Sequence, residues 1–122
     1  MLPKINRIVS DKDIKATYHS KFKLRSELFS LITKRNTFQT NFKILIIVSK
    51  KISKKAHDRN KIKHRISAIA QELILENQPN NEFSIIVIVQ SKEIIKTKYS
   101  DLRIKLEASF SKNLFYKQSM PR

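Results

Sequence analysis

The sequence predicts a single α+β domain, built on a small mixed sheet of three to four strands with a helix near each end of the chain. Two short, strongly apolar segments, Phe42–Val48 and Phe83–Val89, have the length and the isoleucine and valine content of buried strands. A helical pattern from Ala56 to Glu76 separates these two segments. Since strands joined by a long crossover helix run parallel, the three segments together predict a β-α-β unit.

The first helix is expected at Asp11–His19. Ser10 has the position of an N-cap, and Asp13 lies three residues further on, in a capping-box arrangement. At helical spacing Ile14 and Tyr18 fall on one face, with lysines on the other. The pattern therefore predicts a short amphipathic helix ahead of the sheet.

Three strands are expected between this helix and the main helix. A short extended segment near Phe22–Leu24 is the candidate for the first strand. Glu27–Thr33 is expected to pair with Phe42–Ser49 as an antiparallel partner, with Lys34–Asn41 as a hairpin loop that contains no glycine. Because the later strand is almost unbroken in apolar residues, we expect it to be a central strand covered on both faces.

The main helix, Ala56–Glu76, has an apolar side and a basic side. The positions expected to face the sheet are Ile62, Ile66, Ile69, Ala70 and Leu73. The opposite side is expected to carry His57, Asn60, Lys61 and His64, with Lys63 and Arg65 on its flanks. We expect the helix to end before Pro79, because the residue that precedes a proline is disfavoured in the α region.

The last helix is expected at Ser100–Tyr116, with its inward positions at Leu102, Leu106, Phe110 and Leu114. Residues 1–116 are then expected to form a single domain, because the sequence shows no linker and no internal repeat long enough to form a structural unit. Residues 117–122 are expected to be a disordered basic tail.

Positive charge is concentrated in one stretch, Val48–Arg65. It holds six lysines and two arginines against one acid, Asp58, and so contributes +7 of the formal net charge of +16. Together with a pI near 10.3, this concentration points to a polyanionic partner, and to nucleic acid rather than a membrane surface. The plainer interpretation is a solvated lysine-rich loop.

The composition speaks against several classes of protein. The chain has no cysteine, which removes thiolate and disulfide chemistry and agrees with a reducing compartment. It has no glycine, so no glycine-rich phosphate loop can form. The three histidines lack the spacing of a zinc site and the acids are scattered, so we expect no metal site and no catalytic residue in the protein. The apolar runs are too short to cross a bilayer and no signal peptide is recognisable, so we expect a cytoplasmic protein.

The basic stretch, SKKISKKAHDRNKIKHR, resembles the signature of the bacterial ribonuclease P protein subunit, usually written S-K-K-x-G-x-A-x-x-R-N-R-x-K-R. The residues that match or nearly match it are Ser49, Lys50, Lys51, Lys55, Ala56, Arg59, Asn60 and Lys63. The departures are Ser53 in place of glycine, Lys61 in place of the central arginine, and His64 in place of the last arginine, with Arg65 one position later. Lysine and neutral histidine lack the planar fork of arginine.

The resemblance extends over most of the chain, from Pro3–Arg7 through Phe83–Val89 to Tyr99–Leu102. In this family the protein binds the catalytic ribonuclease P RNA and the 5′ leader of precursor tRNA, and the RNA, with bound Mg²⁺, performs the hydrolysis. The resemblance therefore implies a ribonucleoprotein endonuclease that matures the 5′ end of tRNA. It also implies a left-handed β-α-β crossover, an exception to the general right-handed rule.

Two surfaces follow as candidate sites. The basic loop and helix side are expected to bind RNA through Lys50, Lys51, Lys54, Lys55, Arg59, Asn60, Lys61, Lys63, His64 and Arg65. The second surface is a shallow cleft between the first helix and the exposed sheet face, which in the family receives the single-stranded leader; here it would be lined by Ile14, Tyr18 and Ser49. Ile14 replaces the usual phenylalanine, and Ile14 and Tyr18 could equally serve to pack the helix onto the sheet.

Two other functions stay open at this point. A ribosomal or RNA-chaperone-like binding module would use the same basic helix, but it would bind structured RNAs without preference for a leader. A DNA-binding protein would use Ala56–Glu76 as a recognition helix, but in this sequence a strand and not a short helix precedes that segment.

Overall fold

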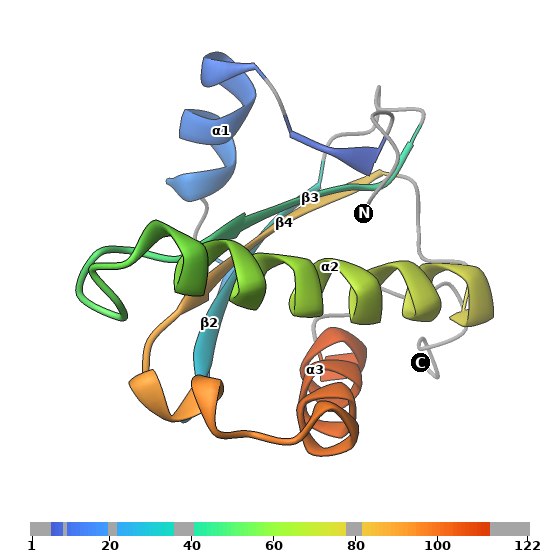
Figure 1. Ribbon diagram of the computed structural model, residues 1–122. Helices are drawn as coiled ribbons and strands as arrows, with labels where there is room; N and C mark the ends of the chain where they lie inside the picture. Colours follow the sequence, from blue (N-terminus) through green and yellow to red (C-terminus); the bar gives the residue numbers. More distant parts are fainter. Residues whose placement is uncertain (1–5, 9, 20–21, 36–40, 78–81, 113–122) are drawn as a thin grey trace.

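The computed structural model describes residues 6–8, 10–19, 22–35, 41–77 and 82–112. In chain order the elements are α1 (Asp11–Tyr18), β1 (Phe22–Arg25), β2 (Phe29–Arg35), β3 (Lys43–Ile47), α2 (Ala56–Asn77), β4 (Phe83–Val89), the short 3-10 helix η2 (Lys92–Ile95) and α3 (Tyr99–Lys112). They form a mixed four-stranded sheet with helices on both faces, which confirms the predicted α+β class (Figure 1). The middle of the predicted hairpin loop (36–40), the end of the predicted last helix (113–116) and the predicted tail (117–122) lie outside the described residues.

The strand order in the sheet is β1-β2-β4-β3. β2 runs antiparallel to β4 over its whole length, from Phe29 opposite Val89 to Arg35 opposite Phe83. β3 runs parallel to β4, and α2 connects the two strands. The predicted parallel β-α-β unit is therefore confirmed, while its left-handedness stays a prediction.

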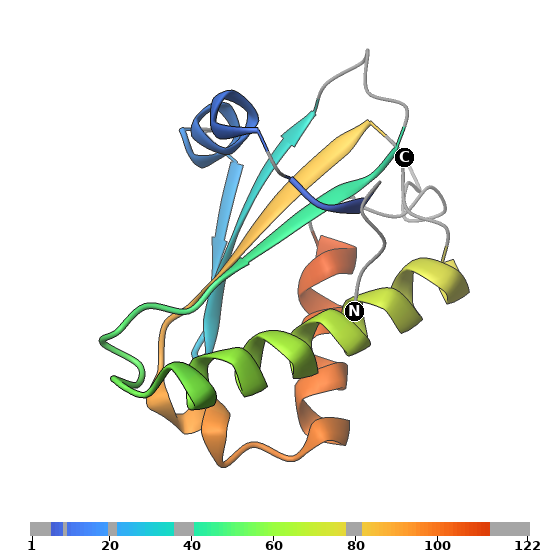
Figure 2. The same ribbon diagram turned by 45° about the horizontal axis from the view of Figure 1, so that its top comes forward.

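The predicted pairing of Glu27–Thr33 with Phe42–Ser49 is wrong. β4 lies between β2 and β3, so β3 is an edge strand and not the central one (Figure 2). The central position suits β4 because it can be covered on both faces. Four consecutive residues of β4 are buried, whereas buried and half-buried residues alternate along β3. The outer edge of β3 is partly covered by the N-terminal segment, through one parallel bridge between Arg7 and Ile44.

The two faces of the sheet are covered by different helices. α2 and α3 pack on one face and α1 on the other (Figure 1). Every residue predicted for the apolar stripe of α2 is buried in the larger core, where α3 contributes Leu102, Leu106 and Phe110. The smaller core lies under α1 and consists of Ile8, Ile32 and Ile86, against which Ile14 packs.

The predicted ends of helices and strands are confirmed to within two residues wherever the structure describes them. Ser10 caps α1, with its Oγ accepting a hydrogen bond from the N–H of Asp13 at 3.4 Å. β2 begins two residues later than predicted, because Ser26 closes a turn by donating from Oγ to the carbonyl oxygen of Phe29 at 2.8 Å. η2 was not predicted; its one buried side chain, Ile94, anchors it to the larger core. Within the described ranges, no helix combines the length and the apolar character needed to span a bilayer.

Candidate nucleic-acid interface

The basic loop, Ser49–Lys55, joins β3 to α2 and exposes the side chains of Lys50, Lys51, Lys54 and Lys55. Between the two lysine pairs, Ile52 is only 6% exposed and belongs to the larger core. Its N–H also donates to the carbonyl oxygen of Ser49 at 3.1 Å. The loop is thus a turn anchored by one apolar side chain, which directs the lysines outward. Ordering the backbone in advance reduces the entropy that binding must overcome.

Ser53 connects the basic loop to the first turn of α2. Its Oγ donates to Oδ2 of Asp58 at 3.1 Å and accepts from the N–H of Lys55 at 3.3 Å. Its carbonyl oxygen accepts a hydrogen bond from Nη1 of Arg59 at 2.9 Å. Arg59 is expected to bind RNA. In the structure, one nitrogen of its guanidinium also holds the loop against the helix. Asp58 additionally stabilises the positive end of the helix dipole.

The basic helix face is the outward side of the first half of α2, with His57, Asn60, Lys61 and His64 exposed and Lys63 and Arg65 half-buried on its flanks. This is the helix rotation that the sequence predicts. Arg65 donates from Nη1 to the carbonyl oxygen of Thr97 at 3.4 Å, so its side chain reaches the segment that precedes α3.

Nearby carboxylates do not neutralise this surface. Among the described residues, the ion pairs join Arg35 to Glu82 and Arg103 to Glu72 and Glu76. None of these pairs includes a residue of the basic loop or the basic helix face. The six lysines and two arginines of Val48–Arg65 therefore outnumber its one acid, Asp58, and such an excess of positive charge attracts phosphates.

An open groove of about 580 Å³, the α2–α3 groove, lies along the basic helix face and reaches the start of α3. It is lined by His57, Asn60, Lys61, His64, Arg65, Ala68 and Tyr99. The structure thus brings together Asn60, Lys61, His64 and Arg65 from the predicted RNA-binding set. His57, Ala68 and Tyr99 were not in that set. Helical spacing cannot place Tyr99 here, because its position depends on how α3 packs against α2.

A network of hydrogen bonds holds Tyr99 against α2. Tyr99 Oη donates to Oε2 of Glu72 at 2.7 Å, while Arg103 donates to Oε1 of Glu72 at 3.1 Å and to Glu76 at 2.5 Å. The hydrogen bond to Glu72, then burial and the charge of Glu72, raise the pKa of the Tyr99 hydroxyl above its ordinary value. The hydrogen bond to Glu76 raises the pKa of Arg103, which stays charged. The first turns of α3 are therefore tied to the second half of α2.

The three residues predicted for a leader cleft have different surroundings. Ile14 is half-buried and packs on the smaller core, so it has the structural role that the sequence left open. Tyr18 is 46% exposed and meets the ring of His19 edge-on, with the ring centroids 5.9 Å apart. Ser49 is exposed just beyond the end of β3. Leu45, Ile47 and Ile88 are half-buried strand side chains that pack against the same smaller core.

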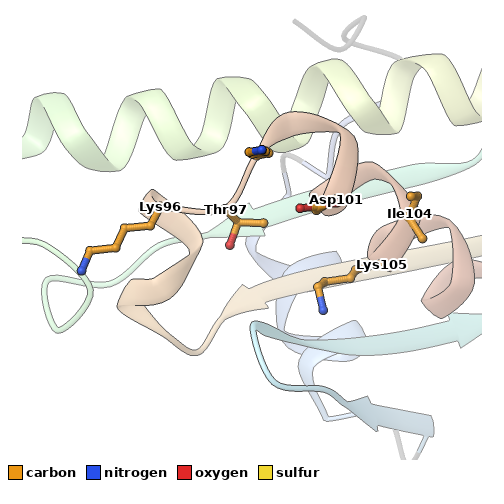
Figure 3. Close-up of a pocket in the computed structure, with 6 residues that line it drawn as sticks. Lys96, Thr97, Asp101, Ile104 and Lys105 are labelled. Atoms are coloured by element: carbon orange, nitrogen blue, oxygen red, sulfur yellow. The ribbon is translucent and has the colours of Figure 1, made fainter.

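A second groove, of about 560 Å³, lies beside the segment between η2 and α3 and is lined by Lys96, Thr97, Lys98, Asp101, Ile104 and Lys105. Figure 3 shows that the amino groups of Lys96 and Lys105 end at separate points of this groove. Asp101 adds a negative charge, and none of the described residues that line this groove is aromatic. It is therefore a weaker candidate for a nucleotide than the α2–α3 groove.

The part of the chain that the structure describes contains no group of three histidine, aspartate or glutamate side chains that could hold a metal ion. Glu72 and Glu76, the acids beside the α2–α3 groove, are both bonded to Arg103. The cationic and amide side chains that line the α2–α3 groove are suited to binding an anion.

Solved structures of known proteins share this fold. The RNase P protein of Staphylococcus aureus aligns with a TM-score of 0.76 and 23% identity, over 92% of this chain and 98% of that chain. A mutant of that protein with defective mRNA degradation activity aligns with a TM-score of 0.80 and 24% identity, over 93% and 92%. The RNase P protein of Thermotoga maritima gives 0.67 and 24%, over 84% and 93%. At these identities the likeness establishes the fold.

The sequence itself establishes the family. A comparison with curated protein sequences finds no match. A sequence model of the family described as Ribonuclease P, however, matches residues 2–113 of the 122. This match includes the basic loop, the basic helix face and the start of α3. The chain belongs to the Ribonuclease P protein family.

Proposed function

We propose that this protein is the protein subunit of ribonuclease P, which binds the catalytic RNA subunit and the 5′ leader of precursor tRNA and so supports cleavage at the tRNA 5′ end. The observation that supports this function best is the group of exposed lysines on the basic loop and basic helix face, in a chain of the Ribonuclease P family. We assign the RNA subunit to this surface and the leader to the sheet face beside α1.

The basic surface is suited to a folded RNA in two ways. Its lysines neutralise phosphates and release counterions, which favours binding at low salt. The buried Ile52 and the hydrogen bonds of Ser53 order the loop before RNA arrives. Asn60 adds a neutral amide that donates and accepts hydrogen bonds, so it responds to the shape of the RNA as well as to its charge.

The leader is assigned to the α1 side because α1 carries an exposed aromatic ring and the sheet face under α1 carries half-buried apolar residues. Tyr18 has a ring on which an unpaired base can stack. Leu45, Ile47 and Ile88 offer a half-buried apolar floor. Ile14 contributes by holding α1 on the sheet.

The chemical step is assigned to the RNA subunit and to the Mg²⁺ that the RNA binds. Mg²⁺ prefers carboxylate oxygens together with water and phosphate oxygens. On this chain Glu72 and Glu76 are engaged by Arg103 and Tyr99, so they do not fit a Mg²⁺ site of the protein's own. The proposed role of the protein is to reduce the repulsion between two RNAs and to hold the leader.

Reconstitution at low Mg²⁺ tests this function, because the RNA subunit then lacks the cations that screen its own charge. The protein is mixed with the ribonuclease P RNA of the same source and a precursor tRNA, and release of the leader is measured. We expect the protein to restore cleavage at the mature 5′ end, and we expect no cleavage from the protein alone. A failure to restore cleavage would contradict the proposed function.

Two controls distinguish this function from general RNA binding. An unrelated structured RNA of the same length should bind more weakly than the ribonuclease P RNA at the same salt concentration. Tyr18→Ala should weaken binding of precursor tRNA to the assembled enzyme and leave binding of leaderless tRNA unchanged. Equal binding of all these RNAs would favour a non-catalytic RNA-binding module.

A further inference from the structure

The α2–α3 groove has two features that phosphate binding alone does not require. One is an aromatic ring, Tyr99, which is 37% exposed; apart from Ala68, the other side chains that line the groove are polar or cationic. The other is Ala68, which follows His64 by one helical turn and precedes Glu72 by one turn on the same side of α2. A longer side chain at this position would extend into the groove. The groove is therefore open beside the ring.

The ring is held in place before any ligand binds. Its hydroxyl donates to Glu72 at 2.7 Å, and the second oxygen of the same carboxylate accepts from Arg103 at 3.1 Å. Both partners of Glu72 lie on α3, so the carboxylate links the helices and fixes the hydroxyl end of the ring. A ring that is already ordered loses little conformational entropy when another flat group stacks on it.

Cationic groups line the same groove. Lys61 is exposed, and Arg65 is positioned by its 3.4 Å hydrogen bond to Thr97, two residues before Tyr99. Asn60 supplies an amide NH2 group with two N–H donors and a carbonyl oxygen that accepts. An aromatic ring beside cations is the combination that binds single-stranded nucleic acid, because the ring stacks on the base and the cations bind the backbone.

Resting on the proposed function, we propose that the α2–α3 groove binds one unpaired base of the ribonuclease P RNA, stacked on Tyr99, with the adjoining phosphates on Lys61 and Arg65. A paired base is excluded because its faces are covered within the helical stack, whereas a base in a loop or bulge can turn outward. The groove volume of about 580 Å³ lies within the range of small-ligand sites, which is sufficient for one nucleotide.

Substitutions at Tyr99 separate stacking from helix packing. Tyr99→Phe and Tyr99→Leu both remove the hydrogen bond to Glu72, and only the first keeps the ring. Tyr99→Leu should weaken binding of the ribonuclease P RNA about 5- to 150-fold, with an unchanged salt dependence because no charge is lost. Tyr99→Phe should keep most of the affinity. Equal affinities for the two variants would overturn the stacking role. If Tyr99 acted only through its hydrogen bond to Glu72, both variants would lose that bond and would bind RNA equally.

A direct optical measurement uses the absence of tryptophan from the chain. Tyr99→Trp creates a protein with one indole, whose fluorescence a stacked base quenches. Single-stranded RNA and the ribonuclease P RNA should quench it, and a blunt RNA duplex of equal charge should not. Quenching by all three RNAs, or by none, would contradict the proposal.

The two proposals can fail separately. Leader release by the unaltered protein together with no quenching would overturn the base site and leave the ribonuclease P function in place. Quenching by single-stranded RNA without any support of cleavage would retain the stacking groove and overturn its assignment to the ribonuclease P RNA. Ala68→Leu gives an independent check, because filling the groove without a change in charge should weaken RNA binding while circular dichroism stays unchanged.

Discussion

Ser53 donates a hydrogen bond from Oγ to Oδ2 of Asp58 at 3.1 Å, across the junction between the basic loop and α2. Ser53 stands where the ribonuclease P signature usually has glycine. In this chain the serine replaces the flexibility of glycine with a side-chain link to the helix, and the basic loop is ordered by that link and by Ile52.

This link gives a first prediction, on stability. Ser53→Gly removes the hydrogen bonds to Asp58 and to the N–H of Lys55, and should lower the free energy of unfolding by about 0.5–2 kcal/mol. Urea denaturation followed by circular dichroism measures the loss. Ser53→Thr keeps a hydroxyl and should lose less. Greater stability in the glycine variant would show that the link to Asp58 contributes nothing.

A second prediction separates the two sides of α2. Ile66 is fully buried, so Ile66→Ala should lower the free energy of unfolding by about 2–5 kcal/mol. Lys61 is exposed, so Lys61→Glu should leave the thermal midpoint nearly unchanged and weaken RNA binding. Thermal melts and filter binding measure the two effects. The assigned helix rotation fails if the lysine variant unfolds or the alanine variant is as stable as the original protein.

The hydrogen bond between Tyr99 and Glu72 predicts a pH dependence. The pKa of Tyr99 is raised in the folded protein, from an unfolded value of about 10, because its hydroxyl donates to a carboxylate. The unfolded state therefore loses its proton first as the pH rises. The stabilisation is fully present below the unfolded pKa and is lost as the pH rises through the folded pKa.

The measurement compares the original protein with Tyr99→Phe in urea denaturation at several pH values. The difference in free energy of unfolding should be constant below about pH 10 and should shrink above it. Glu72→Gln serves as the control, because it removes the hydrogen bond to a carboxylate and the negative charge of Glu72, both of which raise the Tyr99 pKa, and should bring that pKa toward its ordinary value. If the difference in free energy of unfolding instead grew above about pH 10, the hydrogen bond from Tyr99 to Glu72 could not be its cause.

The basic surface predicts a steep dependence of RNA affinity on salt. For about 6–10 phosphate contacts, the affinity should fall about 10³- to 10⁵-fold between about 50 and 200 mM salt on the scale known for duplex DNA. Titrations of the ribonuclease P RNA at several salt concentrations give the slope. An affinity that does not change with salt would contradict the electrostatic role of the basic loop and helix face.

The sequence alone predicted correctly which residues are buried where helical spacing within a single segment decides it. The stripe from Ile62 to Leu73 is buried as predicted, and the exposed positions from His57 to His64 fall on the opposite side. Both results follow from helical spacing within a single segment. The parallel relation of β3 to β4 was likewise predictable, because a long helix lies between them.

Strand order and the full lining of the groove could not be predicted in this way. Neighbouring strands pair more often than not, so Glu27–Thr33 and Phe42–Ser49 were expected to be partners, but β4 occupies the position between them. Tyr99 joins the basic helix face because α3 packs against α2, where Glu72 binds both Tyr99 and Arg103. Such a contact spans 27 residues of sequence and leaves no local pattern.

Leader release with Asn60→Ala tests the central claim, that the basic helix face recognises the ribonuclease P RNA by more than its charge. Asn60 is exposed and neutral, so this substitution leaves the net charge at +16 and removes only the amide. The rate of cleavage is measured at low Mg²⁺ with the RNA subunit of the same source. The account predicts that the original protein restores cleavage at the mature 5′ end and that Asn60→Ala restores it less well. Equal restoration by the two proteins would contradict it, since positive charge alone would then explain the activity.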